Sequence, residues 1–124
     1  ILVHGSLGLK GAQQLGQNLQ EKLNNDNIKS LVIASVDFSH YLTLEKAEQM
    51  DKISIKAVKN RDINNIQYFD NDYMDSPPSI ITLLSAMEAA AAKDMKILDH
   101  SNSDKITGTR NNETTSYFTV IFYK

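Results

Sequence analysis

Apolar side chains recur along this chain at two spacings, and the wider spacing predicts four helices. Intervals of three and four residues occur over 11–23, 43–59, 62–69 and 76–92, and they place the apolar positions on one face of a helix. Polar residues that favour helix starts begin the last three segments, namely Thr43, Asp62 and Ser76. The expected buried face of the second helix consists of Ala47, Met50, Ile53, Ala57 and Val58.

Short runs of β-branched and apolar residues predict four strands, over 1–3, 31–35, 97–98 and 115–123. The first two are joined by the first helix, which favours a parallel pair with a right-handed crossover. The last run follows a polar turn over 105–115, in which Gly108 can adopt a positive φ. We therefore predict an α/β fold with a layered sheet of about four mostly parallel strands flanked by helices, the last strand lying at an edge or antiparallel.

Composition narrows the classes of protein to which this chain can belong. Its 124 residues fit one domain, and 41% hydrophobic with 23% charged residues is ordinary for a folded chain. A net charge of −2 offers no basic surface to nucleic acid or to an anionic membrane. The chain has no cysteine, so imidazole or carboxylate groups would have to hold any metal. No apolar run is long enough to span a bilayer, and we expect a cytoplasmic location with no nucleic-acid or membrane partner.

Candidate chemistry gathers just after the second predicted strand, at Asp37, Ser39 and His40. Open α/β sheets bind ligands beyond the carboxyl ends of their strands, which is where these side chains are expected. A carboxylate beside an imidazole can hold a proton near neutral pH. The same spacing also fits a purely structural role, in which the aspartate caps a helix and the histidine is only hydrogen-bonded.

Two further loops supply polar candidates. Asp75 lies next to the helix that Ser76 and Pro77 begin, and the unpaired N–H groups of a helix start stabilise an anion. This carboxylate can therefore serve either as a cap or as a ligand for a hard metal. His100 and Asn102 lie in a polar loop after the third predicted strand, where they can be ordinary loop residues or part of a pocket.

Five segments, taken in order, resemble one known family. They are Val32-Ile33-Ala34-Ser35-Val36-Asp37-Phe38-Ser39-His40-Tyr41, Ala47-x-x-Met50-Asp51, Asp75-Ser76-Pro77-Pro78-Ser79-Ile80-x-x-Leu83-Leu84, Asp99-His100-Ser101-Asn102-Ser103 and Thr115-Ser116-Tyr117. Together they resemble the carboxyl-terminal half of the Memo family, also called AmmeMemoRadiSam system protein B, which is related in fold to the class III extradiol dioxygenases. By this resemblance, residues 1–124 are the carboxyl-terminal part of a single Memo-like α/β domain, and its missing amino-terminal half is an expected partner.

The resemblance also implies roles for individual residues. His40 matches a family histidine that faces the metal pocket and resembles the acid/base histidine of the dioxygenases, with Asp37 as the residue that orients it. Asp75 aligns with the family's third metal ligand, which is a cysteine. The other two family ligands are histidines from the amino-terminal half, which this chain does not contain. Ser39, His100 and Asn102 are expected to line the same pocket.

These observations lead to two hypotheses about function. The first is a Memo-like protein whose pocket resembles that of non-haem metal dioxygenases, with Fe(II) or another divalent metal in the intact protein. Such a pocket would support metal-dependent redox chemistry on a small molecule, or simply bind it. The alternative is a metal-free scaffold module that uses the same pocket to bind a peptide or partner, and the absence of the family's cysteine favours it.

Overall fold

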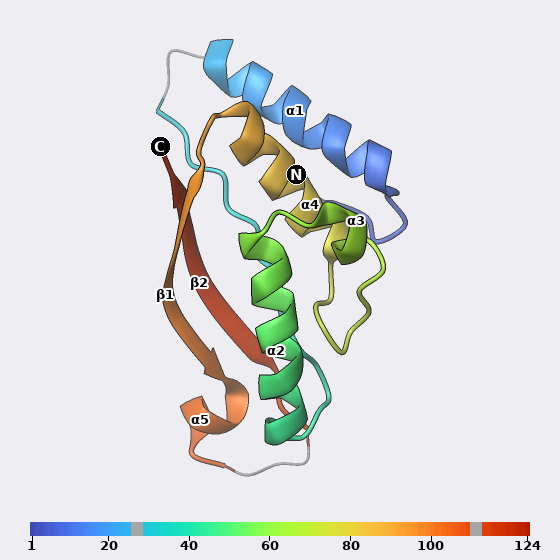
Figure 1. Ribbon diagram of the computed structural model, residues 1–124, viewed down its shortest axis with the longest axis vertical. Helices are drawn as coiled ribbons and strands as arrows, with labels where there is room; N and C mark the ends of the chain where they lie inside the picture. The colour runs from blue at the N-terminus through green and yellow to red at the C-terminus, as the bar shows by residue number, and fades with distance from the viewer. Residues whose placement is uncertain (26–28, 110–112) are drawn as a thin grey trace.

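The computed structural model describes residues 1–25, 29–109 and 113–124, and they form a mixed α/β structure, as predicted. Figure 1 shows α1 lying across α4 at one end of the molecule, while α2 runs along a pair of strands. The elements, in chain order, are α1 (Leu9–Asn25), α2 (Leu44–Lys59), α3 (Ile63–Ile66), α4 (Pro77–Ala89), β1 (Asp94–Asn102), α5 (Ser103–Thr107) and β2 (Ser116–Tyr123).

All four predicted helices are present, and their starts follow the expected local chemistry. Asp62 is the N-cap of α3, where its side chain accepts a hydrogen bond from the N–H of Asn65. Thr43 and Ser76 occupy the N-cap positions of α2 and α4 without accepting a hydrogen bond from a main-chain N–H of the helix, and Pro77 fills the first turn of α4. Sequence periodicity therefore located these helices correctly, even where the cap bond is absent.

The buried face of α2 differs from the predicted one. Ile53 is 46% exposed, whereas Asp51 and Ser54 are buried together with Ala47, Ala57 and Val58. The prediction of Ile53 in the core was wrong because two polar side chains on the inward face have hydrogen-bond partners there.

The helix pair of α1 and α4 packs closely. A Cβ atom added to Gly16 would lie 2.3 Å from the carbonyl oxygen of Thr82, so only glycine permits this approach. The hydroxyl of Thr82 also donates a hydrogen bond of 3.3 Å to the carbonyl oxygen of Ala12. The hydrophobic core runs from this helix pair towards the strands and contains Ala12, Phe38, Ala57, Val58, Ile66, Met74, Ile80, Ile81 and Leu84.

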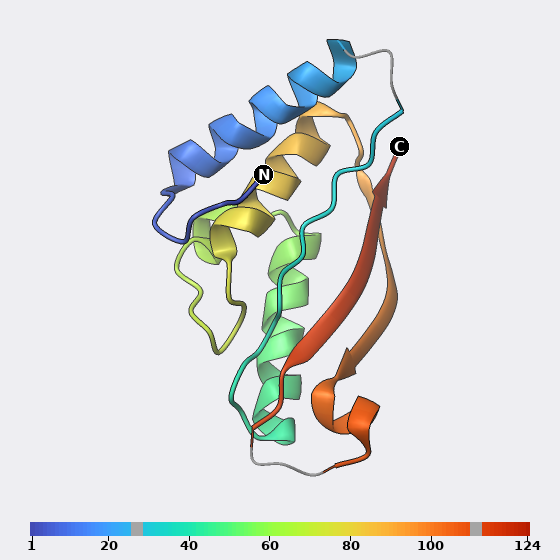
Figure 2. The same ribbon diagram turned by 180° about the vertical axis from the view of Figure 1, so that it is seen from behind.

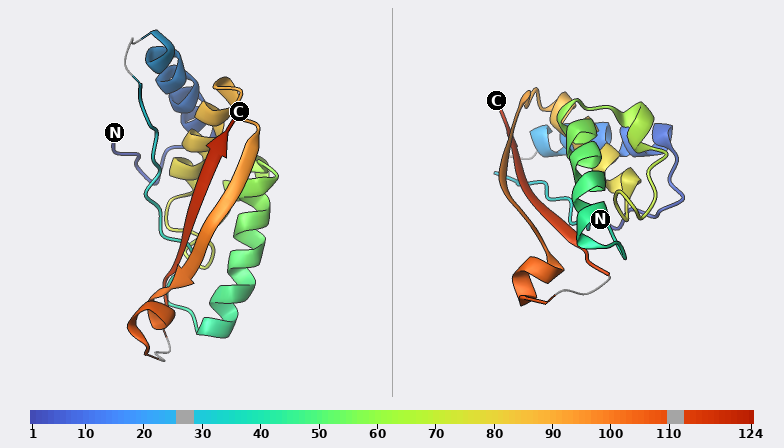
Figure 3. Two further views of the ribbon diagram at one scale, coloured as in Figure 1. Left: turned by 90° about the vertical axis from the view of Figure 1, so that its left-hand side faces the viewer. Right: turned by 60° about the horizontal axis from the view of Figure 1, so that its bottom comes forward.

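The strands β1 and β2 pair antiparallel, from Asp94 opposite Tyr123 to Asn102 opposite Ser116. The register is irregular between Ile97 and Asp99, where β1 carries one extra residue. Figure 3 shows the pair as a long curved ribbon with α5 at one end. The antiparallel pairing predicted for the last strand is confirmed, but the expected sheet of about four mostly parallel strands is not found among the described residues.

Two of the four predicted strands are extended but unpaired. Residues 1–3 and 31–35 belong to no strand, and Leu31 and Ile33 are 83% and 75% exposed instead of buried. A strand exists only when a neighbour pairs with its main chain, and a local pattern of apolar residues cannot supply that neighbour. Figure 2 shows the extended segment over 29–42 crossing the length of the molecule towards the start of α2.

The chain between 97 and 109 also differs from prediction. β1 continues to Asn102, so His100 and Asn102 lie in a strand and not in a loop. The expected polar turn over 105–115 contains part of α5, which begins where Asn102 accepts a hydrogen bond from the N–H of Lys105 and ends at Gly108 with φ of +69°. Residues 110–112 of that turn lie outside the described residues. Among the described residues, no helix combines the length and apolar character needed to cross a membrane.

Candidate metal centre

Two chain segments bring Asp37, His40 and Asp75 together. The N–H of Asp75, in the loop before α4, donates to the carbonyl oxygen of Asp37 at 3.0 Å. His40 is held to the same loop, because its N–H donates to the carbonyl oxygen of Asn71 at 2.9 Å. On the opposite side, the N–H of Phe38 donates to the carbonyl oxygen of Ser116 at 2.9 Å. The main chain from 37 to 40 is therefore fixed between β2 and the loop that carries Asp75.

The three side chains form a compact group, in which one nitrogen or oxygen atom from each lies within 4.8 Å of the others. Oδ2 of Asp37 lies 4.0 Å from Nε2 of His40, which is too far for a hydrogen bond. Bonds of about 2.1 Å to a shared ion bring ligand atoms to within roughly 4 Å of one another. The group therefore has nearly the spacing that a small divalent ion requires.

His40 presents an unused nitrogen to this group. Its side chain is 13% exposed, and its Nδ1 lies 3.3 Å from the hydroxyl oxygen of Thr115. Its Nε2 is buried and has no hydrogen-bond partner among the described residues. If Nδ1 donates its proton to Thr115, the lone pair on Nε2 remains available to a metal or a proton. Thr115, and not Asp37, thus hydrogen-bonds the ring.

Asp75 lies largely exposed at the edge of the group, yet the surrounding protein perturbs its carboxyl group. Partial burial raises the pKa of Asp75, and the negative charge of Asp37 raises it further. His40 acts in the opposite direction and lowers this pKa, as do hydrogen bonds from the main chain. Two carboxyl groups placed close together gain from a cation between them, because a cation removes their mutual repulsion.

A cleft of about 370 Å³ borders Asp75. It lies between the loop over 5–9 and the loop that precedes α4, and Leu7, Phe69 and Met74 contribute apolar wall. The only charged residues that line it are Asp70 and Asp75, among those the structure describes. The cleft therefore suits a small molecule with an apolar body and hydrogen-bond donors or positive charge.

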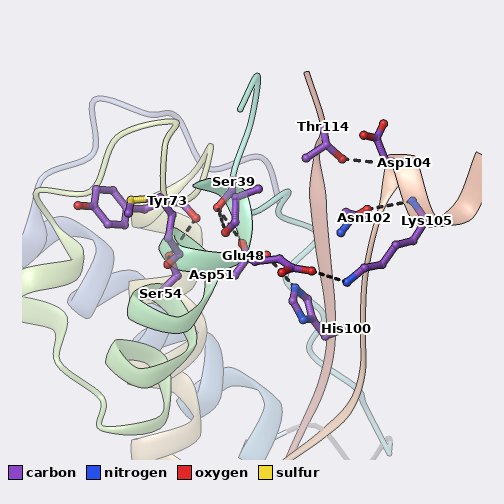
Figure 4. A network of polar contacts seen from close by, with 12 residues as sticks. Ser39, Glu48, Asp51, Ser54, Tyr73, His100, Asn102, Asp104, Lys105 and Thr114 are labelled. Atoms are coloured by element: carbon purple, nitrogen blue, oxygen red, sulfur yellow. Dashed lines mark hydrogen bonds and ion pairs between the residues drawn. The ribbon is translucent and has the colours of Figure 1, made fainter. Parts of the chain in front are cut away.

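Ser39 and His100 lie outside this group and belong to a second polar cluster, drawn in Figure 4. Both contact Asp51 of α2: the hydroxyl of Ser39 donates to Oδ1 at 2.7 Å, and Nε2 of His100 lies 2.7 Å from Oδ2. Ser39 is fully buried and Asp51 is 1% exposed. The structure thus gives two of the predicted pocket residues a common partner in Asp51, which is not one of the candidate metal ligands.

Asn102 caps a helix through its side-chain oxygen, while its buried Nδ2 has no hydrogen-bond partner among the described residues. Its side-chain oxygen accepts a hydrogen bond of 2.9 Å from the N–H of Lys105, which makes it the N-cap of α5. His4, which sequence analysis did not assign to the pocket, is exposed and bonded to Ser6. The predicted residues therefore divide into one group of possible ligands and several residues with visible structural contacts.

Sequence reasoning missed Asp51 and Thr115 as partners of the predicted site residues. Asp51 was detectable, because it lies four residues after Ala47 and seven before Val58, on the buried stripe of α2. A carboxylate on such a stripe needs a partner and so marks a buried polar cluster. Thr115 lies in a segment that resembles the family, but its contact with His40 depends on how the chain before β2 lies beside the extended segment, which a local pattern does not reveal.

Comparison with known proteins gives consistent matches to a single family. The relatives are each described as a MEMO1 family protein: one from Aquifex aeolicus is 28% identical over 115 residues, or 90% of this chain and 42% of its own length. One from Methanococcus vannielii is 36% identical over 84 residues, or 65% of this chain and 30% of its own length. One from Methanosarcina mazei is 26% identical over 102 residues, or 80% of this chain and 38% of its own length.

The chain therefore spans about two fifths or less of the length of these curated relatives. The family model described as Memo-like protein matches residues 2–121, which is almost the whole chain. The match includes the segments that carry Asp37, His40, Asp51 and Asp75. This chain belongs to the Memo-like protein family.

Proposed function

We propose that this chain contributes Asp37, His40 and Asp75 to a divalent-metal site beside a pocket for a small molecule. The pocket would support metal-dependent redox chemistry similar to that of the non-haem metal dioxygenases. The observation that carries the proposal is the buried Nε2 of His40, which has no hydrogen-bond partner among the described residues and lies 4.0 Å from Oδ2 of Asp37. One ring nitrogen of His40 also lies within 4.8 Å of a carboxylate oxygen from each of Asp37 and Asp75. A buried nitrogen without a partner is unfavourable, and a bound ion would remove that cost.

The donor set suits a particular range of ions. One imidazole and two carboxylates combine a borderline ligand with two hard ones, a mixture that fits Fe(II) or Mn(II) better than Cu(I). These three residues leave other coordination positions free for water, substrate or ligands from elsewhere in a Memo-like domain. A metal held in this way would supply Lewis-acid or redox chemistry, and these three residues would fix its position.

The chain's own groups can also manage protons at this site. Nε2 of His40 has no hydrogen-bond partner among the described residues, so it can bond to a metal or to a group of the bound molecule. Asp75 holds its proton to a higher pH than an ordinary aspartate, since its pKa is raised. The cleft beside Asp75 would receive the small molecule, with its apolar wall against the body of the ligand.

Anaerobic calorimetric titration with Fe(II) tests the metal site directly. We expect the 124-residue chain to bind a single Fe(II), and His40→Ala and Asp75→Ala to lose that binding because each removes a ligand. His4→Ala and Asp99→Asn are matched controls, since both residues are exposed and lie outside the group. They should bind Fe(II) as the unaltered chain does.

If the unaltered chain binds neither Fe(II) nor Mn(II), the metal proposal is wrong. Equal loss of binding in His4→Ala and His40→Ala would contradict the assignment of the ligands. In the first case the metal-free scaffold reading becomes the better one, and the same variants can be compared for binding to candidate partners. In the second case the chain binds metal through other ligands than the three proposed.

One observation favours a second candidate function, in which the extended segment binds a partner strand. No main-chain hydrogen bond joins residues 31–36 to another segment within the described part of the chain. Leu31 and Ile33 point apolar side chains outwards from this segment. An exposed, apolar and unpaired strand is a template for β-strand addition.

We propose the amino-terminal part of a Memo-like domain as the occupant of this edge. The curated relatives are more than twice as long as the region matched, so they contain enough chain to supply a covering strand. Mixing this chain with that part from a relative should produce a one-to-one complex in sedimentation, and Ile33→Lys should prevent it. Self-association of this chain in place of the complex would contradict the proposed occupant.

A further inference from the structure

A closed ring of side-chain contacts includes two residues of the segment that carries Asp37 and His40. It joins Ser39, Asp51, His100, Phe118 and Phe38, and it closes because Phe38 and Ser39 are consecutive residues. The ring connects three elements, since Asp51 is in α2, His100 in β1 and Phe118 in β2. Both residues on the extended segment lie between Asp37 and His40.

The polar half of the ring is a buried carboxylate with two donors. Figure 4 shows Asp51 between Ser39 and His100, with a dashed line to each. Since a carboxylate accepts hydrogen bonds, the Ser39 hydroxyl donates to one oxygen and the His100 ring N–H to the other, both at 2.7 Å. A carboxylate this deeply buried destabilises the fold unless such partners bond to it, so the folded chain requires both hydrogen bonds.

The aromatic half of the ring reaches the same segment by another route. The His100 ring stacks on Phe118 with centroids 4.1 Å apart and an interplanar angle of 4°. Phe118 in turn meets Phe38 edge-on, with centroids 4.7 Å apart and an angle of 66°. The His100 imidazole therefore contacts Asp51 through its edge and Phe118 through its face, and these two contacts fix its orientation.

We propose that Asp51 and His100 are positioning residues of the candidate metal centre, which they hold through Ser39 and Phe38. This inference rests on the proposed metal site. The link is short, because Ser39 precedes His40 directly and follows Asp37 by two positions. The carbonyl oxygen of Ser39 also accepts a hydrogen bond of 3.0 Å from the N–H of Ser116. Side chain and main chain of Ser39 thus anchor the segment from two sides.

Two paired substitutions separate positioning from general stability. Asp51→Asn leaves one oxygen for two donors, and His100→Ala removes the donor, so both should weaken Co²⁺ binding by about tenfold or more. Both should also change the visible absorption of bound Co²⁺, which reports ligand geometry. His100→Gln keeps an N–H donor near the position of Nε2 and should restore much of the affinity and the spectrum.

A matched control is Thr82→Val, which removes a buried hydroxyl bond in the α1 and α4 pair and none of the contacts of Asp51 or His100. It should destabilise the fold without changing the Co²⁺ spectrum. If Thr82→Val weakens Co²⁺ binding as much as Asp51→Asn does, the role of Asp51 is only structural and the inference is wrong.

Amide hydrogen exchange without metal makes the two proposals separable. The N–H groups of Phe38, His40, Asp75 and Ser116 bond across the Asp37–His40 segment. They should lose protection in Asp51→Asn and keep it in Thr82→Val. If the unaltered chain binds no Co²⁺ but these amides lose protection, the metal site is overturned and the anchoring stands. If the amides keep their protection in Asp51→Asn, the positioning inference is overturned.

Discussion

Two aspartate–histidine pairs in this molecule differ in one respect that matters for function. Asp51 and His100 lie 2.7 Å apart, and a serine hydroxyl bonds the second carboxylate oxygen. Asp37 and His40 lie 4.0 Å apart, and Nε2 of His40 has no partner within the described ranges. The first pair is closed, because its hydrogen bonds are made within the protein. The second pair is open.

The difference shows how the same two residue types can be structural in one place and available for chemistry in another. A closed pair gains its stability when the chain folds, so a ligand has nothing to add to it. An open pair retains an unused nitrogen and an oxygen, with a third carboxylate nearby in Asp75. We therefore propose the open pair as the functional one and the closed pair as its support.

The largest expected contrast is in stability. Asp51→Ala removes the buried acceptor of two donors and should lower the free energy of unfolding by about 3 kcal/mol. Asp37→Ala removes a half-exposed side chain without a short hydrogen bond and should change it by about 0.5 kcal/mol or less. Urea unfolding of the two variants measures both values. Equal losses would show that the open pair is structural as well.

The second contrast is the response of stability to metal. At a free Fe(II) concentration of about 100 times Kd, the folded state should gain about 2.7 kcal/mol. The gain should vanish in His40→Ala and persist in His4→Ala, because only the first variant removes a proposed ligand. Thermal unfolding with and without Fe(II) under anaerobic conditions measures it. A gain that survives in His40→Ala would place the metal elsewhere.

Sequence periodicity located the helices because the main-chain hydrogen bonds of a helix lie within one segment of the chain. The caps at Asp62 and Asn102 and the positive φ at Gly108 each depend on only a few neighbouring residues. α5 was overlooked although its signals were present, namely Asn102 before the helix and Gly108 after it. The strands over 1–3 and 31–35 were predicted wrongly, because pairing depends on neighbours that a local pattern does not reveal.

The candidate site was predictable to a similar extent. The motif around Asp37 and His40, together with Asp75, pointed to the three side chains that the fold does bring together. The family resemblance places His100 and Ser39 in the same pocket. Their actual partner is Asp51, a residue from a different element, and spacing along the chain cannot reveal a contact between elements. The open or closed state of each pair needed three-dimensional distances.

The smallest effect, and the sharpest test of the open pair, is the pH dependence that Asp75 contributes without metal. Its pKa is raised on folding above the ordinary value of 3.8, chiefly by burial and then by the charge of Asp37. A raised carboxyl pKa means that the folded state favours the protonated form, so this contribution to stability is fully present below the unfolded pKa. It is lost as the pH rises through the folded pKa. Asp75→Asn removes that loss, so the variant should gain on the unaltered chain as the pH rises through this window and keep its advantage at pH 7. Urea midpoints across the window measure the gain.

Asp37→Asn should show part of the same gain, because it removes the second cause of the raised pKa of Asp75 and leaves burial in place. If Asp37→Asn differs from the unaltered chain by the same amount at every pH, the two carboxylates do not interact, which would contradict the proposal that they share an ion.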